Sequence, residues 1–506
     1  MSEFENEKQM GGHPLCVKKI RRSSARKEIG AEFVLPDYMG DVKRVLKYTA
    51  TATPCNTLIS DTEASFLSIV TFRVTYLDND DLLTEACFSA DAEFSEKLSL
   101  GCVSANAEYK TQAISVRLSG PRKISAKTVV NCDVSMLEEI SVCENNSYDG
   151  AESLRKEIGI HTVEYLKCSE REYAEQIDKI PESRADDFEI VKSTALAFID
   201  AVRKTEQGIN LSGYADACVL LRGEEGIVRL EKRIPIEEHL ECDLKDSSVF
   251  VPYAFVSGAT VNLNNASGEN ECAVSVVMNM TVECAVSHHF CETYTVVSDA
   301  FFEGCKNKCM YENLEFSSLG NCVFEKVPLN LTIDRTEAPL YDVLESGMEI
   351  KNLRCELTGA EAQISCDAEI NLIARGGGSE SCYSIKEKAE FSKKYRLNAR
   401  EGDKIEIDAI PCEISVSFDG DKIYVEAQML VSLITEERHT ESVLSGICCE
   451  REEERDERLI TVYYPEDNDT LWSVSKKYGV SMEKISSINE IRNNSIENCD
   501  KIIIVK

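Results

Sequence analysis

The C-terminal stretch LITVYYPEDNDTLWSVSKKYGVSMEKISSINEIRNNSIENCDKIIIVK, residues 459–506, has the clearest pattern of secondary structure in the chain. Short runs of β-forming residues, 460–464 and 502–505, open and close it. Apolar residues recur at helical spacing between them. Asp469 can accept hydrogen bonds from the free amides of a first helix, and Gly479 suits the left-handed position where that helix ends. A second helix follows, so the expected order is strand, helix, helix, strand.

This stretch resembles the LysM module. Three motifs lie in register with it, namely Asp469-Thr470-Leu471-Trp472, Lys477-Tyr478-Gly479-Val480-Ser481, and Asn489 after the second helix. The resemblance implies two loops, on one side of the module, that bind glycans containing N-acetylglucosamine. Carried over residue by residue, it assigns to these loops Asn468, Asp469, Thr470, Leu471, Asn489, Ile491 and Arg492.

Two positions differ from the LysM pattern. Asn468 replaces the usual Gly before the Asp-Thr pair, and Cys499-Asp500 replaces the usual Gly-Gln before the last strand. A Cβ at position 468 could crowd a glycan in a shallow groove lined by backbone. An alternative interpretation is that Asp469 is only a helix cap and Trp472 only an anchor in the core.

Composition limits the classes of function that the whole chain can have. Its 506 residues allow three or four domains, and the net charge of -33 disfavours binding to nucleic acid or anionic lipid. No apolar run approaches the roughly 20 residues that span a bilayer, so no integral membrane segment is expected. Residues 1–7 are acidic and do not resemble a signal peptide. We therefore expect a cytoplasmic protein.

From residue 35 onward the sequence is rich in β-forming residues and repetitive, which predicts a mainly β fold. A strand-turn-strand pattern ends at Phe94 and returns with equivalent positions at Ile236 and Phe391. A second hairpin pattern follows each copy. The copies lie much farther apart than the ~20–50 residues of a solenoid repeat, so three homologous domains are expected.

The predicted organisation has seven parts. They are an N-terminal arm (1–34), three β-rich domains (35–146, 185–305 and 325–446), a helical connector (147–184), a charged linker (447–458) and the LysM-like module (459–506). The arm carries the basic residues Lys18, Lys19, Arg21, Arg22, Arg26 and Lys27, which indicate a solvated segment or contact with an acidic partner or a membrane. Apolar spacings of three and four residues predict a helical turn at 42–46 and an amphipathic helix at 186–202.

The β-rich domains resemble the SPOCS domain of spore-coat-associated proteins. The resemblance rests on Leu35-Pro36-Asp37, the strand-turn-strand ending at Phe94, and the run from Leu118 to Ile124. Several such domains followed by one LysM module resemble the SipL type of spore-coat morphogenetic protein. This implies an assembly adaptor on the mother-cell side of the forespore, with a spore-coat scaffold protein as its partner. The alternative is a protein tethered to peptidoglycan by its LysM module.

Cysteine is abundant, with 22 residues. Without an export signal most are expected to be free thiols, although Cys448, Cys449 and Cys499 could cross-link an assembly under oxidising conditions. One group, containing Cys284, His288, His289, Cys291, Cys305 and Cys309, has ligand types suited to zinc. Cys291, Cys305 and Cys309 are weak candidate ligands, and no metal or cofactor is expected.

Motifs of catalysis are also absent from the sequence. There is neither a phosphate-binding Gly-x-x-x-x-Gly-Lys-Ser/Thr loop nor a Gly-x-Ser-x-Gly nucleophile motif. Only six histidines are available for acid-base chemistry. The sequence therefore predicts a binding or assembly protein and not an enzyme.

Overall fold

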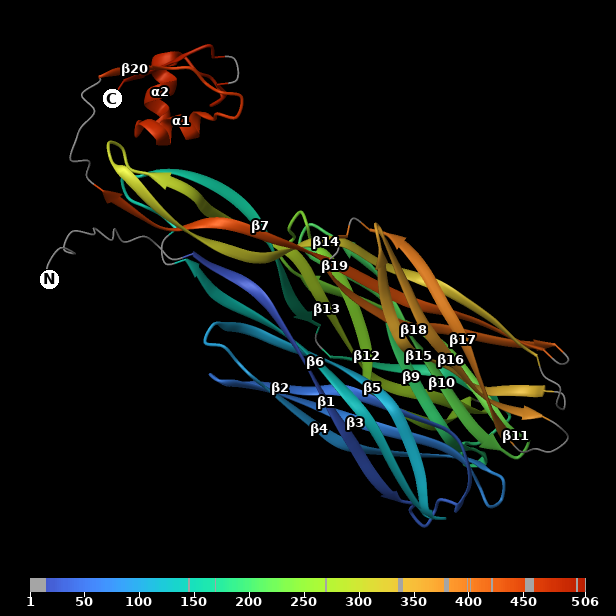
Figure 1. Cartoon of the computed structure of the whole chain (residues 1–506). Coiled ribbons are helices and arrows are strands. Elements are labelled where there is room, and N and C mark those ends of the chain that lie inside the picture. Colours follow the sequence, from blue (N-terminus) through green and yellow to red (C-terminus); the bar gives the residue numbers. More distant parts are fainter. Residues whose placement is uncertain are drawn as a thin grey trace.

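The computed structural model describes residues 15–143, 146–168, 170–268, 271–334, 340–376, 382–397, 399–400, 402–419, 422–450, 459–496 and 499–505. Long twisted strands form an elongated body, and a small domain containing both α-helices lies at one end of it (Figure 1). The mainly β fold agrees with the sequence prediction.

The body consists of three successive units with related strand order. In each unit a strand is followed by a three-stranded meander and then by a hairpin, whose second strand pairs with the first strand of the unit. The first unit contains β1 (Leu15–Val34), β2 (Val42–Ile59), β3 (Glu63–Asp78), β4 (Leu83–Lys97), β5 (Cys102–Gly120) and β6 (Lys123–Cys143). The second contains β7 (Glu152–Lys167), β8 (Arg171–Pro181), β9 (Glu189–Lys204), β10 (Gly208–Gly223), β11 (Gly226–Glu241), β12 (Val249–Gly268) and β13 (Glu271–Phe301). The third contains β14 (Lys306–Asp334), β15 (Leu340–Thr358), β16 (Glu361–Gly376), β17 (Cys382–Arg396), β18 (Lys404–Asp419) and β19 (Lys422–Glu450).

Each unit buries its own apolar core. In the first unit, alternate residues of β3 point inward, so that Phe66 and Phe72 are almost fully buried. They join a cluster with Val130 and Met136 of β6, which belongs to the other sheet of the unit. Removing one such phenyl ring should cost about 3–5 kcal/mol of folding free energy. Equivalent clusters lie between the sheets of the second and third units.

A buried group of charged side chains connects all three units. The carboxylate of Glu345 on β15 lies 2.6 Å from the Lys47 ammonium of β2 and 2.9 Å from that of Lys192 on β9. Lys192 also contacts Glu85 of β4 at 2.8 Å. Burial alone raises the pKa of Glu345, but the two lysines lower it to about 2. Each unit therefore supplies charges that would be unpaired without the others.

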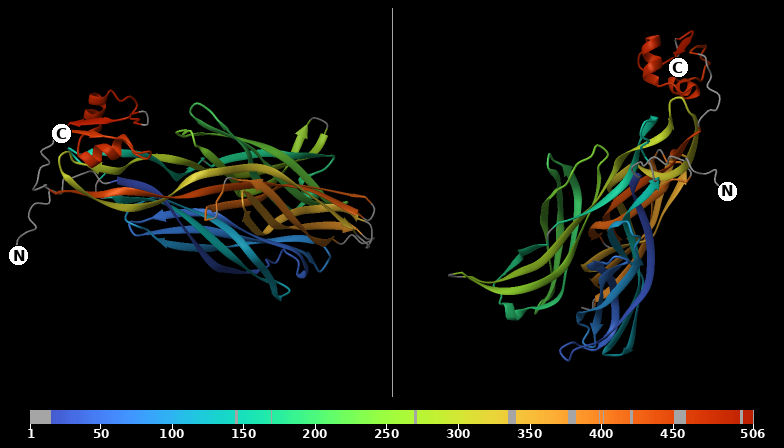
Figure 2. Two further views of the ribbon diagram at one scale, coloured as in Figure 1. Left: turned by 45° about the horizontal axis from the view of Figure 1, so that its top comes forward. Right: turned by 90° about the vertical axis from the view of Figure 1, so that its left-hand side faces the viewer.

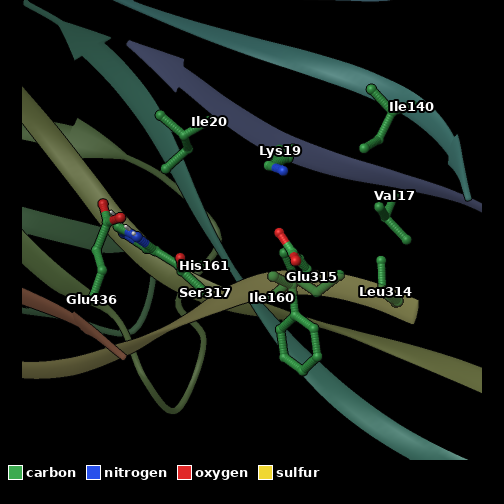
Figure 3. Close-up of a pocket in the computed structure, with 11 residues that line it drawn as sticks. Val17, Lys19, Ile20, Ile140, Ile160, His161, Leu314, Glu315, Ser317 and Glu436 are labelled. Atoms are coloured by element: carbon green, nitrogen blue, oxygen red, sulfur yellow. Dashed lines mark ion pairs between the residues drawn. The ribbon is translucent and has the colours of Figure 1, made fainter. Parts of the chain in front are cut away.

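A second junction surrounds a cavity of about 40 Å³ lined by residues of all three units (Figure 3). Arg22 of β1 pairs with Glu436 of β19 at 2.6 Å, and the ring of His161 on β7 lies 3.3 Å from the same carboxylate. His161 also contacts His289 of β13 at 3.1 Å between ring nitrogens. Burial raises the pKa of Glu436, whereas His161 and Arg22 lower it to about 2.

The N-terminal arm was wrongly predicted, since residues 15–34 form strand β1, paired along its length with β6. Three of its basic residues, Lys18, Arg21 and Arg22, pair with carboxylates of neighbouring strands, as Arg21 does with Glu138 at 2.6 Å. The predicted domains 35–146 and 185–305 omit the first strand of their units, β1 and the divided strand β7–β8, and the predicted domain 325–446 includes only the end of β14. These strands pair with the end of the unit, a distant partner that local patterns do not reveal.

The helices predicted in the body were also wrong. The connector 147–184 contains strands β7 and β8, residues 42–46 begin β2, and residues 186–202 hold a short 3-10 turn, Ala185–Asp187, followed by β9. Pairing of β9 with β10 skips one residue at Val191 and another at Asp200, so bulges give the apolar positions a helix-like spacing. Similar shifts occur at the start of β2. The charged linker 447–458 starts inside β19, and its residues 451–458 lie outside the described part of the chain.

Candidate functional site

The C-terminal domain has the predicted order of strand, helix, helix and strand. Its elements are β20 (Ile460–Tyr463), α1 (Leu471–Tyr478), α2 (Met482–Asn489) and β21 (Ile502–Val505). The strands pair in antiparallel fashion with Tyr463 opposite Ile502, so the loops 464–470 and 490–501 leave the sheet at the same end. The buried core between helices and strands contains Leu471, Val474, Val480, Ile485, Ile496, Ile502 and Ile504.

Asp469 shapes the first loop. One carboxylate oxygen accepts hydrogen bonds from the Tyr463 hydroxyl and from the Glu466 amide at 2.9 Å. These bonds hold the pKa of Asp469 below its ordinary value, the Glu466 amide making the largest contribution. The predicted helix cap was placed one residue too early, because the Thr470 hydroxyl accepts the amide hydrogen of Ser473 at 3.0 Å. Asp469 therefore closes the loop before the helix begins.

Asn489 fixes the second loop. Its side-chain amide donates to the carbonyls of Ile485 and Ile503 at 2.9 and 2.7 Å, and its carbonyl accepts the Ile503 amide at 2.7 Å. The end of α2 is thereby tied to β21. Glu490 and Asn493 then take left-handed backbone conformations, with φ of 54° and 58°, which turn the loop.

The seven predicted loop residues therefore fall into two groups. Asn468, Thr470 and Arg492 have exposed side chains, whereas the amide of Asn489 and the carboxylate of Asp469 are occupied inside the domain. Leu471 is buried in the core and Ile491 packs against it. Several other loop residues that the motif comparison did not assign are also exposed, among them Asp467, Asn493 and Asn494. The run of asparagines after α2 was the sequence feature that could have indicated the last two.

Residues 467–504 match the LysM domain. The match includes both helices, the second loop and residues 467–470 of the first loop, and it agrees with the motif-based prediction. No curated protein and no solved structure shows significant similarity to the chain.

The LysM domain packs against the body through the outer side of α1. Trp472 is 9% exposed but lies outside the core cluster of the domain, and its ring contacts Phe301 at the end of β13. The indole N–H donates to Asp299 at 2.9 Å, and the Lys476 ammonium donates to the other oxygen of Asp299 at 2.5 Å. Both views of Figure 2 place the domain at this end of the body.

Two backbone contacts continue this interface at the turn between the helices. The Gly304 amide donates to the carbonyl of Gly479 at 3.1 Å, and the Ser481 amide donates to Glu303 at 2.8 Å. This turn joins the end of α1 to the start of α2, whereas the two loops adjoin the opposite ends of these helices. Docking therefore holds the domain while the side chains of Asn468 and Arg492 stay exposed.

The weak zinc candidates do not converge. Cys305 is bonded in a disulfide, the Cys291 sulfur accepts the Leu319 amide at 3.3 Å, and Cys309 lies beside Lys476 at the LysM interface. Within the described ranges there is no group of three or more His, Cys, Asp and Glu side chains placed to hold a metal ion. Nor does any helix of these ranges have the length and hydropathy to cross a membrane.

Proposed function

We propose that this chain is a non-enzymatic glycan-binding protein that recognises N-acetylglucosamine-containing polymers, such as peptidoglycan, with loops 464–470 and 490–501. The observation that carries this proposal is the LysM match, which includes residues 467–470 of the first loop and all of the second; both loops leave the same end of the β20–β21 pair. Asp469 and Asn489 hold the loop backbones internally. A site that is already ordered loses less conformational entropy on binding.

The exposed loop side chains suit a neutral, polar ligand. Asn468, Asn493 and Asn494 each offer an amide that can donate and accept hydrogen bonds, as hydroxyl and N-acetyl groups require. Arg492 adds a cationic donor in a chain of net charge -33. A neutral oligosaccharide therefore avoids the repulsion that the overall charge imposes on an acidic polymer.

The test is a calorimetric titration of the full chain with a soluble oligomer of N-acetylglucosamine, together with co-sedimentation on purified peptidoglycan. Arg492→Ala should weaken binding about tenfold, because a hydrogen bond to a charged group contributes about 1.5–3 kcal/mol. Lys484→Ala removes the same charge from the exposed side of α2 and should leave binding unchanged. Failure of the unmodified chain to bind either ligand would refute the proposal.

A second proposal, supported by the architecture, is an assembly adaptor in the spore coat. Three units of related strand order precede the LysM domain, which is the arrangement implied by the resemblance to SPOCS-domain proteins. In this case the LysM domain and the β-rich units would bind a coat-scaffold protein on the cytoplasmic, mother-cell side of the forespore. Removal of residues 459–506 should then abolish recruitment of the chain to the forespore, while Arg492→Ala should retain it.

A further inference from the structure

The second unit differs from the other two at its first strand. In the first and third units this strand is continuous, as β1 and β14, whereas in the second it is divided into β7 and β8. Both pieces pair with β13: Lys167 at the end of β7 lies opposite Ala285, and Arg171 at the start of β8 lies opposite Val282. The division therefore falls beside the middle of β13.

A pair of cysteines lies at this division. The backbone amide of Cys168 donates to the carbonyl of Cys284 at 2.9 Å, directly after the Lys167 and Ala285 pair, so the two cysteines face each other across neighbouring strands. Facing residues of antiparallel strands have Cα atoms about 4.5–5.5 Å apart, within the range that a disulfide spans. Both thiols are free, and their side chains are hydrogen-bonded to each other.

The two thiols differ in access and in acidity. Cys284 is 4% exposed, whereas Cys168 is half-buried and can be reached from solvent. The hydrogen bond between the thiols lowers the pKa of Cys168 and raises that of Cys284. Burial and the Glu238 carboxylate oppose this lowering of the Cys168 pKa, and Arg171, which is paired with Glu238 at 2.9 Å, adds a smaller favourable contribution. Cys168 is thus the attacking thiol and Cys284 the buried partner.

We propose that Cys168 and Cys284 form a redox-modified site that closes to a disulfide on reaction with a low-molecular-weight disulfide. The Cys168 thiolate attacks one sulfur of that oxidant, which breaks its S–S bond and releases one thiolate. Cys284 loses its proton and attacks the Cys168 sulfur, which expels the second small thiolate. Two protein thiols are oxidised, one small disulfide is reduced to two thiols, and no other reactant is needed.

The disulfide would tie the divided outer strand to β13 and enclose β8 to β12 in one covalent ring. Because the ring is long, it restricts the unfolded second unit strongly. Oxidation should therefore raise the melting temperature of this unit by roughly 5–10 °C.

The experiment treats the reduced full chain with oxidised glutathione, blocks remaining thiols with iodoacetamide, and maps the peptides without reduction. The expected product is a peptide linking residues 168 and 284, together with the higher melting temperature in calorimetry. Cys284→Ala should leave Cys168 as a stable mixed disulfide with glutathione. Cys355→Ser is the control, since Cys355 is a half-buried strand thiol that faces Ile364. This variant should still form the disulfide between residues 168 and 284.

Two results would overturn the proposal. One is alkylation of both Cys168 and Cys284 after the oxidant has consumed Cys16 and Cys55, two exposed thiols that act as internal references. The other is a linkage of either residue to a different cysteine in the unmodified chain. Peptide mapping of the unmodified chain is sufficient for both and does not depend on a variant folding.

Discussion

Asp299 should decide whether the LysM domain stays docked on the body. Its carboxylate accepts hydrogen bonds from the Trp472 indole at 2.9 Å, from Lys476 at 2.5 Å and from the Tyr311 hydroxyl at 2.8 Å. The first two cross the interface between the domain and the body. We therefore expect Asp299→Ala to release the domain while both parts remain folded.

The size of the effect follows from these contacts. Hydrogen bonds to a charged group contribute about 1.5–3 kcal/mol each. The side chains of Asp299 and Lys476 are 19% and 29% exposed, so solvent screening favours the lower end. A total of about 2–4 kcal/mol corresponds to a decrease of roughly 30-fold or more in the docking equilibrium constant. The remaining contacts are too weak to compensate; they are the edge of Trp472 on Phe301, the bonds at Gly304 and Glu303, and the longer contacts of Lys476 with Cys309 and Tyr311.

Trp472 is the only tryptophan of the chain, so its fluorescence measures docking directly. Undocking exposes the indole, and Asp299→Ala should shift the emission maximum to longer wavelength and increase quenching by acrylamide. Glu483→Ala, which removes an exposed carboxylate from α2, should leave both quantities unchanged. An emission maximum and quenching constant equal to those of the unmodified chain would show that Asp299 does not hold the interface.

Three further predictions follow from other contacts. Burial raises the pKa of Asp299, but the bonds from Lys476 and other donors lower it overall. The contribution of Asp299 to docking is therefore present at neutral pH and lost as the pH falls below about 4. Trp472 fluorescence at stepped pH checks this, and Asp299→Ala should show no such transition. Asn489→Ala should destabilise the LysM domain by about 1–3 kcal/mol by leaving backbone groups of β21 unpaired, measured as faster amide exchange there. Glu345→Gln should destabilise the body by about 3–5 kcal/mol, because it leaves the ammonium groups of Lys47 and Lys192 without their shared carboxylate; urea unfolding that matches the unmodified chain would contradict this.

The C-terminal domain was predictable because its determinants are local. Gly479 takes the left-handed conformation expected at the end of α1, with φ of 63°, and the strand, helix, helix, strand order fits within one short segment. The docking of Trp472 was not predictable, because its partners Asp299 and Phe301 lie on a distant strand. Motif spacing also could not show that Asn489 has all its amide hydrogen bonds inside the domain.

In the body, the periodicity of apolar residues identified strands only where their pairing with neighbouring strands has no bulges. Bulges at Val191 and Asp200 gave β9 the spacing of a helix. In β7, Ile160 and His161 are both buried although they point to opposite faces, because neighbouring units cover both sides of this strand. Alternation, the usual sign of a strand, disappears under those conditions. The first strand of each unit was missed because its partner lies at the end of the same unit.

The pairing of the first and last strands in each unit makes the two ends of the molecule different. Leu15 pairs with Cys143, Glu152 with Phe301, and Lys306 with Glu450, so every unit starts and finishes at the same place. Apolar residues near these points, from all three units, form one cluster, and the LysM domain docks beside them. The chain thus returns repeatedly to one pole, and the hairpins that end the units, β5–β6, β12–β13 and β18–β19, turn at the opposite end of their long strands. Molecules attached to a surface through the LysM domain would all share one orientation, with the end opposite this domain facing away from the surface.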